Sequence, residues 1–370
     1  MRGIMVQSLV SRGVPFETAL QTATVIRDKV AGRGQVPIEE LARLVEQELA
    51  GHDLEAVPLR PVEEPPLVRS AKSESGMPFS KGILAVSLQG AGLDPSDAWD
   101  VARELEARLL KTARREVDRD ALRDLVRDTI ERTHGARAAE RYTVWRRARE
   151  DGRPVLILIG GSSGVGKTSV AVEVGRRLEI PRVIGTDSIR QIMRLMFSAD
   201  LMPEIHGSTF DVYRSLRLTG GGLYEPVVQG YREQVSKISV GVQALIDRAV
   251  EENVSMVVEG ANLLPGALDL ARHRESAHII FLVCAMFDEA VYRSRFAKRG
   301  DAVRERGADR YLDHYDEILK IQDHILSEAD HWGLPIIDNV RFDDAVTSVI
   351  RSVIETLKKS MSPDPVSETA

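Results

Sequence analysis

The chain has 370 residues, of which 43% are apolar and 29% charged, a composition typical of two or three globular domains with buried cores. Its formal net charge of −6 argues against a general nucleic-acid-binding protein, because such proteins displace counterions with a basic surface. A single cysteine excludes a disulfide framework within the chain, and no apolar run approaches the length of a membrane helix. Composition therefore predicts a cytoplasmic protein that binds neither nucleic acid nor a membrane.

Two stretches near the start of the sequence resemble each other. Residues 1–50 and 78–150 align at a constant offset of 79, and a two-residue insertion then aligns "ELARLVEQEL" with "ALRDLVRDTI". The identities are Gly3, Ile4, Ser8, Leu9, Gly13 and Ala19 with Gly82, Ile83, Ser87, Leu88, Gly92 and Ala98. The pattern predicts a duplicated helical unit, of which the first copy is truncated. Chance similarity between two amphipathic stretches is the alternative. Residues 51–77 between them are rich in Pro, Glu and Ser and predict an extended linker.

The second copy carries two further features. It begins with "PFSKG", and it ends with the helical pattern "ARAAERYTVWRRARE", in which Ala139, Tyr142 and Trp145 recur at helical spacing. These features resemble the ATP-cone, a small, mostly helical module that binds nucleotides and regulates the enzyme attached to it. The resemblance implies that the second copy is the one to bind nucleotide if only one does. The alternative is a scaffold without ligand, and a duplicated module is compatible with a homo-oligomer.

From residue 151 to 358 the pattern changes to alternating strands and helices. The apolar runs are "VLILI", "PRVIGTD", "NVSMVVEG", "AHIIFLVC" and "LPIID", and helices are predicted over 168–178 and 188–197. Strands that are apolar throughout indicate a parallel sheet covered on both faces. We therefore expect an α/β domain with a doubly wound sheet of the P-loop NTPase type, and a disordered tail over 359–370. Cys284, in the fourth run, is predicted to be a buried core thiol.

The first of these strands leads into a phosphate-binding motif. The pattern G-x-x-x-x-G-K-[ST] is matched by Gly161, Ser162, Ser163, Gly164, Val165, Gly166, Lys167 and Thr168. Its backbone amides would surround the phosphates of ATP, Lys167 would bridge the β- and γ-phosphates, and the Thr168 hydroxyl would ligate Mg²⁺. A glycine-rich turn that binds nothing is the alternative, and the strand before and helix after the motif argue against it.

Two carboxylates follow other strands, where ligands of such sheets bind. Asp187 ends the second strand and is a candidate base for a substrate hydroxyl, or else a helix N-cap. Glu259 ends the third strand and would hold Mg²⁺, or else face solvent. Acidic groups at two strand ends favour phosphoryl transfer over simple nucleotide binding.

Basic and hydroxyl side chains complete the candidate site. Arg190 lies one helical turn after Asp187 and would hold an anionic acceptor. In "HGSTFDVYRSL", His206, Ser208, Thr209 and Arg214 are either acceptor contacts or, for the hydroxyls, helix caps. Arg295 follows the fourth strand and would close over the transferring phosphoryl group, or else belong to a solvated basic helix face.

Together these residues resemble the 2-phosphoglycerate kinase family. The similarity runs from about residue 78 to 358, and "TDSIRQIMR" combined with "STFDVYRSL" is more specific than the phosphate loop. It implies transfer of the γ-phosphoryl group of Mg-ATP to 2-phosphoglycerate, a phosphorylated hydroxy acid, giving 2,3-bisphosphoglycerate. It also adds Arg194 to Arg190 as a partner of the acceptor's anionic groups.

The chain departs from the family pattern in its extra, truncated copy and in its Pro-rich linker, which puts regulation in doubt more than chemistry. A kinase for another small anionic alcohol and a non-catalytic ATP-sensing regulator are the alternatives.

Overall fold

The computed structural model describes residues 5–6, 9, 14–30, 36–50, 66–70, 73–111, 116–216, 225–302 and 308–361. These residues fall into two compact units, Met1–Pro66 and Leu67–Ala370. The first unit contains helices α2 (Phe16–Val30) and α3 (Ile38–Leu49). In the described part of the chain, no helix is long and apolar enough to cross a membrane.

The second unit begins with a helical module that carries a small sheet. Its strands pair in the order β2-β1-β3, with β1 and β2 antiparallel and β1 and β3 parallel. The elements are β1 (Leu67–Ser70), β2 (Ser73–Pro78), α4 (Lys81–Gly90), α5 (Pro95–Lys111), β3 (Glu116–Asp118), α6 (Arg119–His134) and α7 (Ala136–Glu150). The predicted linker is therefore too long at its C-terminal end, because residues 67–70 and 73–78 form a β-hairpin that packs beside α6. Residues 51–65 of that linker lie outside the described residues.

The helices of the two similar stretches begin at equivalent positions. Phe16 of α2 and Pro95 of α5 are 79 residues apart, as the sequence alignment expects. The buried side chains also correspond at the offsets of the alignment. The equivalent pairs are Met5 and Leu84, Val6 and Ala85, Leu9 and Leu88, Val14 and Leu93, Ala19 and Ala98, Ala23 and Ala102, Ile26 and Leu105, and Val45 and Val126. Correspondence of buried positions along the helices favours a shared fold over chance similarity.

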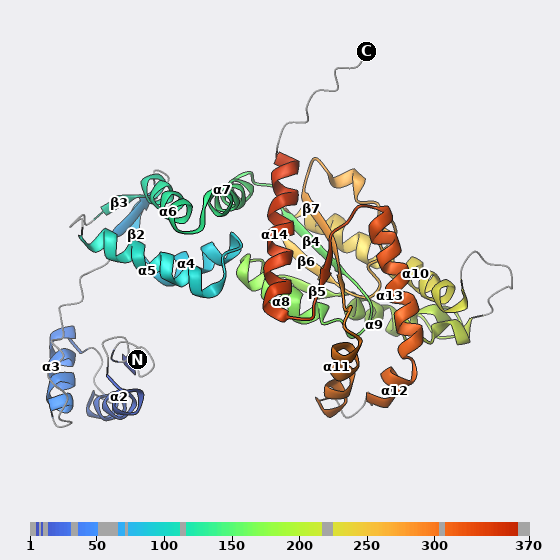
Figure 1. Cartoon of the computed structure of the whole chain (residues 1–370), viewed down its shortest axis with the longest axis horizontal. Coiled ribbons are helices and arrows are strands. Elements are labelled where there is room, and N and C mark those ends of the chain that lie inside the picture. Colours follow the sequence, from blue (N-terminus) through green and yellow to red (C-terminus); the bar gives the residue numbers. More distant parts are fainter. Residues whose placement is uncertain are drawn as a thin grey trace, which may run out of the picture. The chain divides into compact units, whose positions relative to one another are not determined.

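The α/β part contains one sheet of five parallel strands in the order β5-β6-β4-β7-β8 (Figure 1). The strands are β4 (Val155–Gly160), β5 (Val183–Gly185), β6 (Met256–Glu259), β7 (His278–Ala285) and β8 (Ile336–Asp338). The helices between and after them are α8 (Lys167–Arg177), α9 (Thr186–Met196), α10 (Pro226–Glu251), α11 (Glu289–Ala302), α12 (Ala308–Asp313), α13 (Tyr315–His331) and α14 (Phe342–Met361). Three 3₁₀ turns, Pro203–Ile205, Val212–Ser215 and Ala271–His273, complete the domain. The doubly wound parallel sheet expected from the sequence is confirmed.

Alternate side chains of β4 enter separate cores on the two faces of the sheet. Ile157 and Ile159 pack with residues of α8 and α14, whereas Leu156 and Leu158 pack with residues of α10. Every residue of β4 is buried, which explains why its sequence is apolar without alternation. Cys284 is fully buried in β7, as expected, and burial raises the pKa of its thiol to about 12.

Helix α7 joins the helical module to the α/β part. Ala139 and Tyr142 pack in the core of the module, and Trp145, one turn later, packs in the core of the sheet. At the C-terminus, α14 continues to Met361, so the first three residues of the predicted tail are helical. Residues 362–370 lie outside the described residues.

Candidate active site

The phosphate loop adopts a backbone conformation that depends on its three glycines. Gly161, which begins the loop, has a φ of 136°. Gly164 has a φ of 86° and Gly166 a φ of 87°, values that side chains with a Cβ adopt at a cost. A Cβ on Gly164 would lie 2.3 Å from the Phe296 ring, and one on Gly166 would lie 2.6 Å from the Asn339 amide. Gly166 is the N-cap of α8, so the amides of the loop lie next to the N-terminus of a helix. This arrangement suits a bound phosphate.

Side chains from helices α11 and α13 hold the loop in place. The hydroxyl of Tyr292, on α11, lies 2.7 Å from Ser162 Oγ and donates to the Ser163 carbonyl at 2.6 Å. Ser162 Oγ also lies 3.3 Å from Oε1 of Gln322, on α13. Ser162 thereby connects the loop to the core more than to a ligand. In the sequence, the helical spacing of Tyr311, Tyr315, Ile318 and Gln322 predicts a stripe of core residues, whereas no pattern marks Tyr292.

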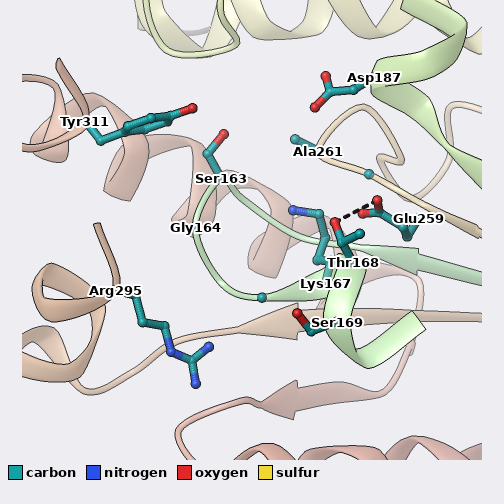
Figure 2. Close-up of a pocket in the computed structure, with 12 residues that line it drawn as sticks. Ser163, Gly164, Lys167, Thr168, Ser169, Asp187, Glu259, Ala261, Arg295 and Tyr311 are labelled. Carbon is teal, nitrogen blue, oxygen red and sulfur yellow. Dashed lines mark hydrogen bonds between the residues drawn. The ribbon is translucent and has the colours of Figure 1, made fainter. Parts of the chain in front are cut away.

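Lys167 and Thr168 start α8 and face the interior of the site. Lys167 Nζ donates to the Ser162 carbonyl at 2.7 Å, which holds the ammonium over the loop. Thr168 Oγ1 donates to Glu259 Oε1 at 2.9 Å (Figure 2). Glu259 ends β6 and is only 8% exposed, so the solvent-facing alternative is wrong. A hydroxyl beside a buried carboxylate at the phosphate loop is a donor set that suits Mg²⁺.

No group of three or more His, Cys, Asp or Glu side chains able to hold a metal occurs among the described residues. Mg²⁺ usually keeps several waters and shares phosphate oxygens with its nucleotide. Thr168 and Glu259 are therefore the residues that would hold it.

Asp187 lies in the first turn of α9 and points into the open part of the site. The N-cap of α9 is Gly185, without a side-chain cap, so Asp187 is not the helix cap. Its side chain is 76% exposed, and its Oδ1 lies 3.1 Å from Arg190 Nη2. Residue pairing between β5 and β6 brings Gly185 opposite Glu259, which places both carboxylates at one edge of the sheet. The sequence-based expectation for this edge thus matches the geometry.

Two cavities open on this edge. The first, of about 380 Å³, is lined by Ser163, Gly164, Gly166, Lys167, Thr168, Ser169, Asp187, Glu259, Gly260, Ala261, Arg295 and Tyr311. The second, of about 220 Å³, is lined by Ser163, Asp187, Arg190, Arg194, His206, Gly207, Ser208, Thr209, Phe210, Ala261, Arg310 and Tyr311. Asp187 lines both, together with Ser163, Ala261 and Tyr311. We call the first the phosphate cavity and the second the basic cavity. The two cavities therefore meet at the carboxylate of Asp187.

The basic cavity gathers the predicted acceptor contacts. Arg190 is largely buried and donates from Nη1 to the Gly207 carbonyl at 2.7 Å, whereas Arg194 is exposed at the rim. Thr209 Oγ1 lies 3.4 Å from Ser163 Oγ, and the Ser208 amide donates to Asp211. Neither hydroxyl caps the 3₁₀ turn at Val212–Ser215.

Arg214, also named from the sequence, pairs with Glu317 outside the cavity lining. A basic residue of the motif "HGSTFDVYRSL" therefore does not necessarily line the basic cavity.

Arg295 lies on the other side of the phosphate loop from Asp187 (Figure 2). Its guanidinium donates to the carbonyls of Val165 at 3.1 Å and Asn339 at 2.5 Å. Burial lowers the pKa of Arg295, which indicates a partly desolvated cation. In this position the guanidinium lies beside Gly166 and α8, and not beside the basic cavity.

The residues of α12 that line the cavities have no counterpart in the sequence-based site. Arg310 and Tyr311 lie on α12, more than a hundred residues after Asp187. Arg310 Nη2 lies 2.5 Å from Asp211 Oδ2, which attaches α12 to the loop that carries Ser208. Tyr311 belongs to the stripe whose helical spacing predicts a place in the core, but it lines both cavities. Only the tertiary fold brings these residues to the site.

The sequence was compared with known proteins. No protein-family model matches it. It is 36% identical over 292 residues to a 2-phosphoglycerate kinase of Methanocaldococcus jannaschii, covering 79% of this chain and 93% of the relative. It is 37% identical over 287 residues to a 2-phosphoglycerate kinase of Methanothermobacter thermautotrophicus, covering 76% and 92%. A third, from Pyrococcus furiosus, is 34% identical over 279 residues, covering 75% and 90%.

Two solved structures also align with the chain. A gluconokinase from Sinorhizobium meliloti has a TM-score of 0.31 and 16% identity, and covers 56% of this chain and 93% of its own. A shikimate kinase from Bacteroides thetaiotaomicron has a TM-score of 0.30 and 15% identity, with coverage of 55% and 98%.

Proposed function

Because the chain belongs to the 2-phosphoglycerate kinase family, and is therefore a phosphotransferase, we propose that its own acceptor is 2-phosphoglycerate. The products would be 2,3-bisphosphoglycerate and ADP. The observation that supports this most directly is the meeting of a phosphate cavity and a basic cavity at Asp187. An acceptor with a phosphate and a carboxylate needs several cations, and Arg190, Arg194 and Arg310 line the second cavity.

In this proposal the nucleotide and the acceptor approach from opposite sides of Asp187. The carboxylate takes the proton of the acceptor hydroxyl, whose oxygen forms a bond to the γ-phosphorus while the bond to the β-γ bridging oxygen breaks. Lys167 and the loop amides stabilise charge on the transferring group. Mg²⁺, when bound at Thr168 and Glu259, supplies further charge neutralisation. Arg190 holds the acceptor, and its ion pair with Asp187 orients that carboxylate.

Arg295 belongs to the nucleotide in this proposal. Its hydrogen bonds to the Val165 and Asn339 carbonyls hold the guanidinium away from the basic cavity. We therefore assign it to the part of the nucleotide that lies over α8, and not to the acceptor. An Arg295→Lys variant should raise the KM for ATP and leave the KM for the acceptor unchanged.

The test of the acceptor is ADP formation from Mg-ATP with 2-phosphoglycerate, 3-phosphoglycerate, glycerate or no acid. Lys167→Ala serves as the blank. ADP formation that requires 2-phosphoglycerate and is absent in the blank is the expected result. ADP formation with another acid alone would retain the kinase and replace its substrate.

We further propose that the helical module of residues 67–150 binds a nucleotide, as its ATP-cone resemblance implies. A cavity of about 340 Å³ lies between the hairpin and helices α4, α6 and α7. Its lining includes Arg119, Arg123, Arg146 and Tyr142. Among the described residues, Nε of Arg123 and of Arg146 are buried without a hydrogen-bond partner. Burial lowers the pKa of Arg146, so an anion beside it would relieve a desolvated charge.

The number of bound nucleotides tests this second proposal. Titration calorimetry with a non-hydrolysable ATP analogue should give two sites in the wild-type chain and one in Lys167→Ala. Arg146→Ala should lose the other site while retaining acceptor-dependent turnover. A single site in the wild-type chain, abolished by Lys167→Ala, would exclude nucleotide binding by the helical module.

A further inference from the structure

One face of α10 holds two loops that border the junction of the cavities. We define the acceptor loop as residues 203–215 and the strand-end loop as residues 259–262. Tyr231 and Gln234 lie one helical turn apart on α10, and both are fully buried. The Tyr231 hydroxyl donates to the Ala261 carbonyl of the strand-end loop at 2.7 Å. The helix thereby contacts the loop that follows the carboxylate of Glu259.

Gln234 uses both ends of its side-chain amide at this junction. Its Nε2 donates to two carbonyls of the acceptor loop, Glu204 at 2.7 Å and Gly207 at 3.1 Å. Its Oε1 accepts from Nδ2 of Asn262, in the strand-end loop, at 3.0 Å. Both donors are thus used on one loop and the acceptor on the other. This single side chain connects the acceptor loop to the strand-end loop.

The Gly207 carbonyl also fixes an acceptor-binding cation. Arg190 Nη1 donates to this same oxygen at 2.7 Å, and Arg190 Nη2 lies 3.1 Å from Asp187 Oδ1. A shift of Gly207 would therefore move the guanidinium, and with it a partner of the proposed base. Gly207 packs closely inside this loop, because a Cβ on it would lie 2.8 Å from Val212 Cα, so Gly207 and Val212 would move together.

We propose that Gln234 is a positioning residue that sets the acceptor loop, and through it Arg190, at a fixed distance from the Glu259 end of β6. The inference rests on the proposed function, because it assigns Arg190 to the acceptor. Leucine at position 234 has a similar size but leaves the Glu204 carbonyl and the Asn262 amide without this partner. An unsatisfied buried polar group is costly, so the loop would relax away from its present position.

The experiment compares Gln234→Leu with Gln243→Leu. Gln243 lies on the same helix and also binds a loop backbone, at Asp269, but Asp269, unlike Gly207, lines neither cavity. Steady-state kinetics with 2-phosphoglycerate and ATP gives the two KM values and kcat for each variant. Hydrogen exchange of the acceptor-loop amides, measured without any acceptor, gives a readout independent of substrate identity.

Gln234→Leu should raise the KM for the acceptor about tenfold, leave the KM for ATP unchanged, and increase exchange in the acceptor loop. Gln243→Leu should change none of these. In a double-mutant cycle, Arg190→Lys should cost less in the Gln234→Leu background than in the wild type. Equal effects on both KM values, or additive effects with unchanged exchange, would overturn the positioning role. If the wild type ignores 2-phosphoglycerate but Gln234→Leu still frees the loop, the substrate fails and the positioning inference stands.

Discussion

The nucleotide side and the acceptor side of this site are built in different ways. The nucleotide side comes from eight consecutive residues, Gly161–Thr168, whose backbone is held by Tyr292 and by the close packing of Gly164 and Gly166. The acceptor side comes from α9, the acceptor loop and α12, and most of its charge lies on long side chains. Backbone amides fit any nucleoside triphosphate, whereas side chains select one acceptor. Under the proposed function, the first side would therefore carry the chemistry shared with other kinases, and the second would carry the specificity for the acceptor.

Asp187 lies where the two sides meet, so its replacement should have the largest effect. Asp187→Asn retains the shape but cannot accept a proton, and kcat should fall by about 10²–10⁴-fold. The affinity for ATP should remain, because the loop is unchanged. Asp200→Asn, an exposed aspartate that lines neither cavity, is the control. Full activity in Asp187→Asn would remove the proposed base.

Lys167 tests the nucleotide side alone. Lys167→Ala removes a cation held over the loop, and kcat should fall by about 10²–10³-fold. The KM for ATP should rise while binding of the acceptor persists. Lys320→Ala, an exposed lysine paired with Glu225, should behave as wild type. A Lys167→Ala variant that binds ATP normally but loses the acceptor would reverse the assignment of the two sides.

Arg190 tests the acceptor side. Lysine cannot reproduce a guanidinium that bonds both Gly207 and Asp187, so Arg190→Lys should raise the KM for the acceptor by about 10- to 100-fold. Arg194→Lys, at the exposed rim, should have a smaller effect in the same direction. Arg214→Lys is the matched control from the same segment, since Arg214 pairs with Glu317. An equal loss in all three variants would mean that general charge, and not position, attracts the acceptor.

Glu173 tests what stabilises the nucleotide side, because its ion pairs hold the C-terminal part of α8. Hydrogen bonds from Arg176 and Arg177 lower the pKa of Glu173 from 4.5 to about 2, although partial burial opposes this. The ion pairs thus stabilise the fold fully above pH 4.5, and this contribution is lost as pH falls from 4.5 towards 2. Glu173→Gln should lower Tm at pH 7 by about 2–4 °C, for a loss of about 1 kcal/mol, with both KM values unchanged.

The pH dependence separates this effect from general packing. The Tm difference between Glu173→Gln and wild type should shrink as pH falls below 4.5. Glu233→Gln, an exposed glutamate of α10, serves as the control. A Tm difference that stays constant from pH 7 to pH 3 would show that the carboxylate charge is not what stabilises α8.

Sequence reasoning succeeded where local pattern determines structure. The buried strand β4, the phosphate loop and the start of α8 are consecutive, so apolar pattern and glycine spacing predict them directly. The hairpin of β1 and β2 was missed, because Pro, Glu and Ser predict a linker and the stabilising partners of β1 include β3, far along the chain. Three-residue strands such as β3 give almost no periodic signal.

The acceptor side shows the complementary limit. Arg190 was predictable from its spacing after Asp187, since three residues make one helical turn. Arg310 was not, because only the packing of α12 against the acceptor loop brings it beside Asp211. Gln234 was not either, since a glutamine in a long amphipathic helix carries no signal of the carbonyls that it will meet. Such residues depend on contacts between segments that are remote in the sequence.

We propose above all that the Asp187 carboxylate serves phosphoryl transfer from the nucleotide to a phosphorylated acceptor. This role is tested most directly by incubating the enzyme with ATP labelled in its γ-phosphate, Mg²⁺ and 2-phosphoglycerate, and identifying the labelled product. The wild-type enzyme should place the label on 2,3-bisphosphoglycerate, and Asp187→Asn, although it binds ATP, should not. Label recovered only as inorganic phosphate, at a rate that 2-phosphoglycerate does not change, would contradict the proposed transfer.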